Sequence, residues 1–352
     1  MEQQVDYIIV GQGICGTFLS YYLDKAGKKI LVIDANHPHT STKVASGVIN
    51  PVTGRRIVRT WMIEEVMPFA VEAYTRLGRE TGKQLIRQCN ILDFHPTAQM
   101  QLAFDERLPT EDYLRIPESA DHWRTYFNYP FAIGETNPCW LIDLHSLLDG
   151  WRSYLRGKNC LSEQQFDHSQ LMIETNKVKY QNIKAEKIFF CDGAAGASNP
   201  FFHLLPFALN KGEAILAKIP DLPNSNIFKQ GFSIVPWKDD RFWIGSTYEW
   251  NFSDANPSEG FRTKVETQLR QWLKLPFEIT DHWASVRPAN IERRPFVGLH
   301  PVHHTIGILN GMGTKGCSLA PFFAYQLSQH IIHGSPIHPN ADVKRFSGIL
   351  SK

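Results

Sequence analysis

The chain has 352 residues, of which 43% are apolar and 20% charged, and its 37 Lys and Arg against 35 Asp and Glu leave a formal net charge of +2. This composition is typical of a globular protein and excludes a disordered chain, a collagen and a coiled coil. The near-neutral balance also argues against a nucleic-acid backbone as the main partner, because such binding needs a cationic surface.

The N-terminal residues carry the pattern of a dinucleotide-binding βαβ unit. A β-prone stretch, a glycine turn, a helical stretch, a second strand and an acidic residue follow one another within about 30 residues. These are residues 6–10, the Gly-Gln-Gly-Ile-Cys-Gly turn 11–16, residues 17–25, residues 30–33 and Asp34. The order and spacing together predict a nucleotide site far more strongly than the glycines alone.

The glycines and the acidic residue each have a physical role in this unit. Gly11 permits the tight turn, Gly13 lets backbone N–H groups approach a pyrophosphate, and Gly16 lets the helix pack closely on the strand. Asp34 accepts the ribose hydroxyls of an adenosine, which disfavours a 2′-phosphate and therefore NADP. The alternative is a glycine turn in a generic βαβ unit, and the unit by itself leaves NAD and FAD open.

The rest of the chain alternates between αβ segments and segments rich in short strands. A loop at 40–59 and a helix at 64–77 precede a mixed region, 81–138, without a long periodic helix. A helix at 141–155, a hairpin at 171–173 and 178–180, and a strand at 187–191 follow. The region 207–279 reads as strands, at 213–217, 232–235 and 242–245, and αβ character returns at Trp283 with a strand 305–309, a glycine loop 310–317 and a helix 319–332.

At roughly 150 residues per domain, this length predicts two domains. We expect an α/β fold in which a Rossmann-like nucleotide-binding domain carries an inserted α+β substrate domain built on an antiparallel sheet. The first domain would comprise residues 1–82, 140–206 and 284–352, and the second residues 83–139 and 207–283.

Six scattered cysteines form no CxxC pair and no metal-ligand spacing. We therefore expect reduced thiols, a cytoplasmic location and no metal site. No segment reaches the roughly 18 uninterrupted apolar residues of a membrane span, so none is expected.

Several elements, taken in order, resemble the FAD-dependent amine and amino-acid oxidoreductases, the family that includes glycine oxidase, D-amino-acid oxidase and monomeric sarcosine oxidase. The resemblance spans nearly the whole chain. It rests on the N-terminal fingerprint with Asp34, Ala45-Ser46-Gly47, the Phe-Cys-Asp-Gly-Ala strand end 190–194, Ile-Gly-Ser-Thr-Tyr 244–248, Val-Arg-Pro 286–288 with Pro295 and Gly298, and the loop 311–316 that enters a helix.

The resemblance implies FAD rather than NAD. The helix after residue 316 would offer free N–H groups and partial positive charge to the flavin O2 carbonyl, where negative charge accumulates on reduction. The residues expected to bind the cofactor are Gly11, Gly13, Ile14, Cys15, Gly16, Asp34, Ala35, Thr42, Ala45, Ser46, Gly47, Gly193, Ala194, Arg287, Gly311, Met312, Gly313, Thr314, Lys315 and Gly316.

Three cations match positions at which family members hold a substrate carboxylate. Arg287 matches the arginine of glycine oxidase and D-amino-acid oxidase, and Arg59 and Lys315 resemble the Arg and Lys pair of monomeric sarcosine oxidases. A guanidinium binds a carboxylate through two parallel N–H bonds. Both sets together indicate a strongly anionic substrate with more than one acidic group, unless a carboxylate such as Glu213 or Glu292 neutralises these cations.

Two departures from the family pattern bear on the cofactor and the electron acceptor. Ser285 stands where sarcosine-oxidase-like members attach flavin through a cysteine, so we expect non-covalent FAD. Tyr248 stands where those oxidases place a lysine that activates oxygen, so the acceptor is either O2 or another molecule.

The resemblance therefore implies oxidation of the C–N bond of a small carboxylated amine, an amino acid or N-methyl amino acid, by hydride transfer to flavin N5, with hydrolysis of the resulting imine. Two alternatives remain open. One is an oxidoreductase acting on a modified tRNA base, against which the absence of a basic stripe argues. The other is a flavin-binding protein without turnover.

Overall fold

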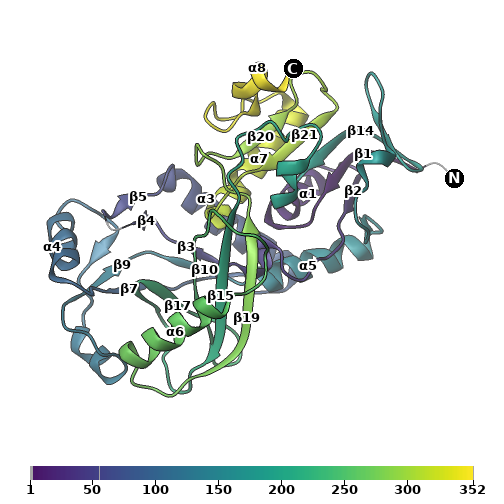
Figure 1. Ribbon diagram of the computed structural model, residues 1–352. Helices are drawn as coiled ribbons and strands as arrows, with labels where there is room; N and C mark the ends of the chain where they lie inside the picture. Colours follow the sequence, from purple (N-terminus) through teal and green to yellow (C-terminus); the bar gives the residue numbers. More distant parts are fainter. Residues whose placement is uncertain (1–2, 55, 352) are drawn as a thin grey trace.

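The computed structural model describes residues 3–54 and 56–351, which form two eight-stranded sheets lying next to each other, together with two smaller ones (Figure 1). Both ends of the chain lie on the side of the first sheet, and the long strands β15 (Asn210–Lys218) and β19 (Glu278–Arg287) lie at the edge of the second sheet (Figure 1). The predicted α/β class with a second, antiparallel sheet is confirmed.

The first sheet has a parallel centre. Strands β11, β2, β1 and β14 lie side by side in that order. The C-terminal end of β14 also pairs with β21, and β21 pairs with β20. Strands β11, β2, β1, β14 and β21 are parallel, whereas β20 and the hairpin β12–β13 pair antiparallel. The bounds are β1 Gln3–Val10, β2 Ile30–Ile33, β11 Leu161–Ser162, β12 Leu171–Ile173, β13 Val178–Tyr180, β14 Ile183–Phe190, β20 Phe296–Leu299 and β21 Ile306–Asn310.

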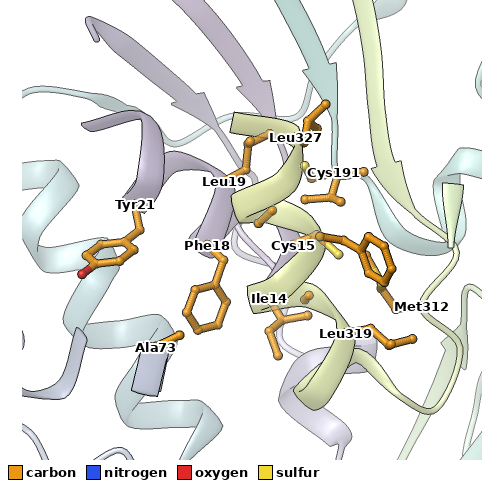
Figure 2. Close-up of a cluster of buried hydrophobic side chains, with 14 of the residues drawn as sticks. Ile14, Cys15, Phe18, Leu19, Tyr21, Ala73, Cys191, Met312, Leu319 and Leu327 are labelled. Carbon is orange, nitrogen blue, oxygen red and sulfur yellow. The ribbon is translucent and has the colours of Figure 1, made fainter. Parts of the chain in front are cut away.

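Alternate residues of these strands feed two hydrophobic clusters, one on each face. Ile9 and Val32 face a cluster built from α1, α3, α5 and α7, and Ile8 and Leu31 face the opposite cluster, to which the C-terminal α8 contributes. Figure 2 shows side chains of α1 and α7 meeting in the first cluster. The helices are α1 Ile14–Lys25, α2 Ser41–Val44, α3 Ile63–Thr81, α4 Ala98–Arg107, α5 Leu144–Gly157, α6 Glu259–Trp272, α7 Gly316–His333 and α8 Ser347–Leu350.

The second sheet has the order β19-β15-β18-β17-β16-β7-β9-β8 and is antiparallel except between β16 and β7. Helix α6 covers one face with Phe261, Val265, Leu269 and Trp272. The other face, which carries Trp243 and Trp283, turns toward the first sheet, and the Trp243 indole N–H donates to the Val44 carbonyl at 2.8 Å. The bounds not yet given are β7 Ile91–Phe94, β8 Leu114–Arg115, β9 Ile133–Thr136, β16 Ile227–Gln230, β17 Phe232–Pro236 and β18 Arg241–Gly245.

The smaller elements complete the chain. Strands β3, β10 and β6 form a three-stranded sheet, and β4 pairs with β5. Their bounds are β3 Val48–Ile49, β4 Val52–Thr53, β5 Val58–Arg59, β6 Ile86–Gln88 and β10 Trp140–Ile142, and the 3₁₀ turns are η1 Ala120–Thr125, η2 His168–Gln170, η3 Gly193–Ser198 and η4 Val343–Phe346.

One sequence-based prediction about an element was wrong, and two helices were not predicted. Residues 141–155 do not form a single helix, because residues 140–142 pair as β10 and Asp143 caps α5 through the Ser146 N–H. Helix α6 lies in the region predicted as strands, and helix α4 lies in the region predicted as mixed structure.

All six cysteines are free, and no helix in the described part of the chain is long and apolar enough to cross a membrane. The domain boundaries stay a prediction.

Candidate functional site

A cleft of about 860 Å³ opens at the carboxyl ends of the parallel strands. Its lining begins at the end of β2, crosses the end of β1 and the end of β14, and reaches the start of α7 and the second sheet. Ligands of open parallel sheets bind at this edge, outside the strand ends. The chain's first and last αβ units therefore meet at one site.

The glycine turn brings the backbone closer than any side chain would allow. A Cβ at Gly16 would lie 1.8 Å from the Gly11 carbonyl oxygen, and one at Gly11 would lie 2.5 Å from the Cys191 carbonyl oxygen. Gly11 also has φ +95°, a conformation that L residues with a side chain rarely adopt. The roles predicted for these two glycines rest on contacts that only glycine permits.

Helices α1 and α7 begin at the cleft, and the residue before each makes no capping bond; the Ile14 N–H of α1 donates instead to Thr42 Oγ1 at 3.2 Å. Neither Gly13 before α1 nor Lys315 before α7 gives a side-chain capping bond, and neither helix has an acidic residue in its first turn. Helices α2, α4, α5 and α6 are instead capped by the side chains of Thr40, Thr97, Asp143 and Ser258. The first N–H groups of a helix need partners, and their partial positive charge favours anions or polar oxygens. Both helix starts are therefore suited to cofactor oxygens.

Asp34 is held in place at the end of β2. Its carboxylate accepts hydrogen bonds from the Gln12 N–H and from Arg152 Nη1, both at 2.8 Å. Desolvation acts to raise the pKa of Asp34, but the donors of Gln12 and Arg152 outweigh it and hold the pKa below its ordinary value. Asp34 is therefore an oriented anion, as a ribose acceptor requires.

Most of the predicted cofactor residues line the cleft. Gly16, Gly47, Gly311 and Lys315 do not. The three glycines instead permit close packing behind the cleft, since a Cβ on Gly47 would lie 2.2 Å from the Ile142 carbonyl oxygen. The predicted residues that line it are Gly11, Gly13, Ile14, Cys15, Asp34, Ala35, Thr42, Ala45, Ser46, Gly193, Ala194, Arg287, Met312, Gly313, Thr314 and Gly316.

Arg287 ends β19 inside the cleft. Its Nη1 donates to Asn210 Oδ1 at 2.6 Å and to the Thr247 carbonyl at 3.0 Å, and its Nη2 donates to Ser246 Oγ at 2.9 Å. The exposed ring of Tyr248 lies 4.7 Å from the guanidinium. All three acceptors are neutral, and desolvation lowers the pKa of this guanidinium. Among the described residues, Arg287 is thus a half-buried cation without a carboxylate partner.

Gly212 makes the room that this guanidinium fills. It lies on β15 beside β19, and a Cβ placed there would lie 1.9 Å from Arg287 Nη2. An isolated glycine within a strand often marks a place where another group comes close to the backbone, so Gly212 was a usable signal in the sequence. It was not used in the prediction.

Lys315 immediately precedes α7. Desolvation lowers its pKa to about 8, and the titratable groups near it are Cys139 and Cys317. Within residues 3–54 and 56–351, no carboxylate forms an ion pair with it. Like Arg287, it is a cation that the protein leaves uncompensated.

Arg59 lies elsewhere. It forms ion pairs with Glu64 at 2.8 Å and with Glu111 and Asp112 at 3.0 Å, its side chain is 38% exposed, and it is not among the residues lining the cleft. Arg59 is therefore a surface arginine paired with carboxylates, which was the alternative considered for these cations.

Further cleft residues were not singled out from the sequence. Arg152 holds Asp34, the indoles of Trp243 and Trp283 form part of the wall, and Asp192 lies at the end of β14. No local motif marks Arg152, Trp243 or Trp283, and only the fold brings them to the site, whereas Asp192 belongs to the strand-end motif 190–194.

The two helix starts at the cleft, the glycine cradle and the oriented Asp34 fit a dinucleotide cofactor, and comparisons agree with this. Glycine oxidase of Bacillus subtilis (strain 168) is 22% identical over 95% of this chain and 94% of its own. Glycine oxidase from Geobacillus kaustophilus has a similar structure, with a TM-score of 0.80 at 16% identity over 98% of each chain. Iminodiacetate oxidase from Chelativorans sp. BNC1 has a TM-score of 0.74 at 18% identity, over 94% of this chain and 96% of that one. A family model described as FAD dependent oxidoreductase matches residues 6–330, and the chain therefore belongs to the family of FAD-dependent oxidoreductases.

Proposed function

We propose that the chain oxidises the C–N bond of a small carboxylated amine, an amino acid or N-methyl amino acid, to an imine that water hydrolyses. The observation that carries this proposal is Arg287, a half-buried cation in the cofactor cleft whose hydrogen-bond partners among the described residues are all neutral. A buried charge without a counter-ion is costly, and an anionic ligand removes that cost. The ligand expected here is therefore a carboxylate.

The geometry of Arg287 leaves part of the guanidinium for a substrate. A guanidinium has five N–H donors. Three are used by Asn210, Thr247 and Ser246, which fix its plane. The Nε hydrogen and one Nη2 hydrogen remain for a ligand, and neighbouring N–H donors of a guanidinium suit a bidentate carboxylate. Arg287 would thus orient the substrate, so that its Cα–H faces the cofactor.

Lys315 supports a substrate with a second acidic group. Its ammonium lacks a carboxylate partner, as the Arg287 guanidinium does. Arg287 lines the cleft at the end of β19, whereas Lys315 does not line it itself but stands between Thr314 and Gly316, which do. A dicarboxylated amine would neutralise both.

FAD, when bound, supplies the hydride acceptor at N5. We propose that it is held without a covalent bond, because Ser285 occupies the position expected of an attaching cysteine. The indoles of Trp243 and Trp283 reduce the water around the reacting carbon. No dedicated base is assigned, since a substrate bound with a neutral amine needs none. Tyr248, over the guanidinium, is proposed to shield Arg287 from water.

The names of the relatives agree with this substrate class. By their names, glycine oxidase, monomeric sarcosine oxidase and iminodiacetate oxidase act on carboxylated amines. The monomeric sarcosine oxidase is that of Arthrobacter sp. (strain TE1826), which is 31% identical over 28% of this chain.

The test is anaerobic flavin reduction by a panel of amines. Purified protein is mixed with glycine, sarcosine, proline, D-amino acids, aspartate, glutamate and iminodiacetate, and flavin absorbance is followed by stopped flow. We expect at least one carboxylated member to bleach the flavin. Full flavin occupancy without bleaching by any member would contradict the proposal and favour a tRNA-base substrate or a flavin binder without turnover.

A further inference from the structure

Asp192 is an acidic side chain in the part of the cleft where a diphosphate cofactor would pass. It follows β14, and β14 lies between β1 and β21 in the parallel sheet. The end of β1 carries the pyrophosphate turn at Gly11, and the end of β21 leads to α7. A dinucleotide that runs from one helix start to the other must therefore pass over the end of β14.

The local contacts place this residue against the glycine turn. A Cβ at Gly11 would lie 3.4 Å from the Cα of Asp192, and Asp192 lines the same cleft as Gly11 and Gly13. Asp192 therefore lines the part of the cleft that the cofactor would cross.

The carboxyl group is held by two amides. Asn310 Nδ2 donates to Oδ1 at 2.9 Å, and Asn199 Nδ2 donates to Oδ2 at 3.0 Å. The orientation of each amide is fixed, because Asn310 Oδ1 accepts from the Gly311 N–H and Asn199 Oδ1 accepts from the Phe201 N–H. Both oxygens of Asp192 thus have a fixed donor, and the carboxyl group cannot rotate without losing these bonds.

No cation in the described part of the chain neutralises Asp192. The titratable groups packed against it are the thiols of Cys15 on α1 and Cys191 at the end of β14, both uncharged because burial raises their pKa. The histidines that line the cleft are His37, His39 and His282. Desolvation raises the pKa of Asp192 to about 6, although the bonds from Asn199 and Asn310 oppose this rise.

We propose that Asp192 binds FAD as a neutral carboxylic acid that donates a hydrogen bond to a cofactor oxygen, so that FAD binding takes up one proton at this residue. A carboxylate beside a diphosphate would be repelled, whereas a protonated carboxyl group gains a donor while still accepting from Asn310 and Asn199. This goes beyond the proposed substrate and does not depend on it, because it concerns FAD alone.

The sign of the pH dependence follows from this. If FAD binds the protonated form, the pKa of Asp192 is higher in the complex than in the free protein. The Kd for FAD is then constant below the free-protein pKa near 6 and rises about tenfold per pH unit above it, until the pKa of the complex is passed.

The experiment measures the Kd for FAD of the full-length apoprotein between pH 5.5 and 8.5 by quenching of FAD fluorescence. We expect a rise of about 50-fold from pH 6 to 8 for the natural chain and a flat profile for Asp192→Asn, which keeps the shape and can donate. His37→Gln is the matched control, since a titrating histidine at the cleft would give the same sign, and it should retain the full slope. A slope that persists in Asp192→Asn, or a natural chain without a slope, overturns the proposal.

A second measurement needs no variant. Calorimetric titration of the apoprotein with FAD at pH 7 in phosphate and in Tris, buffers with different ionisation enthalpies, reports the protons taken up. An uptake approaching one proton supports the proposal, and zero uptake or proton release contradicts it. Both readouts concern cofactor binding, so a failure of the substrate proposal leaves them unaffected.

Discussion

Arg287 and Arg59 were both expected to hold a substrate carboxylate, and their surroundings differ sharply. Arg59 is paired with three carboxylates on an exposed surface, whereas Arg287 has only neutral acceptors inside the cofactor cleft. A cation whose charge is already compensated gains little from a ligand anion, while an uncompensated one gains much. The partners of an arginine, rather than its motif, thus indicate whether it serves binding.

The largest effect is expected at Arg287. Arg287→Ala should lower kcat/KM for the carboxylated substrate by about 10³-fold, since truncating one member of a buried hydrogen-bonded charge pair costs about 4 kcal/mol. Steady-state kinetics with the most active panel member measures this. Arg287→Lys, which keeps the charge but loses the fork, should recover part of the loss. An activity within threefold of the natural chain would remove Arg287 from the site.

A smaller effect is expected when Arg287 is moved but not removed. Gly212→Ala places a Cβ where the guanidinium lies and should raise KM by roughly 10-fold to 100-fold, since small displacements of positioning groups are costly. Gly260→Ala, on α6 with nothing within 4 Å of the new Cβ, is the control. Equal KM values for the two variants would show that the guanidinium needs no such room.

Lys315 should give a pH-dependent effect. Its cation is lost as the pH rises through about 8, so the Kd for succinate should rise above that pH, while the Kd for acetate should change less. Lys315→Met should weaken succinate by about tenfold below pH 8, an amount typical of one partly buried ion pair, and remove this pH dependence. Perturbation of the flavin spectrum reports both affinities. An unchanged succinate profile in Lys315→Met would exclude Lys315 from anion binding.

The smallest effect is expected at Arg59. Arg59→Ala should leave kcat/KM within about twofold, because exposed ion pairs contribute little and the residue does not line the cleft. The same kinetic assay measures it. A loss approaching that of Arg287→Ala would mean that Arg59 reaches the substrate after all.

The nucleotide-binding half of the fold could be predicted because its signals are local. Residues 30–33 form β2 as expected, and the glycine turn begins α1. The second sheet was harder. Helix α6 was missed although Phe261, Val265 and Leu269 repeat at helical spacing, and α4 gave little signal because only Phe104 is buried.

The candidate site could be predicted in part for the same reason. The cofactor residues lie in contiguous motifs, and the prediction of an FAD-dependent oxidoreductase is confirmed by the family match. The burial, partners and orientation of Arg59, Arg287 and Asp192 depend on strands far apart in the chain. Sequence could therefore nominate the two arginines but could not distinguish between them.

The most direct measurement compares Arg287→Ala and Arg59→Ala in anaerobic flavin reduction, with the most active amino acid and with its uncharged carboxamide. The natural chain and Arg59→Ala should strongly prefer the acid, and Arg287→Ala should reduce its flavin about equally slowly with both compounds. Retention of the preference in Arg287→Ala, or its loss in Arg59→Ala, would contradict carboxylate recognition by Arg287.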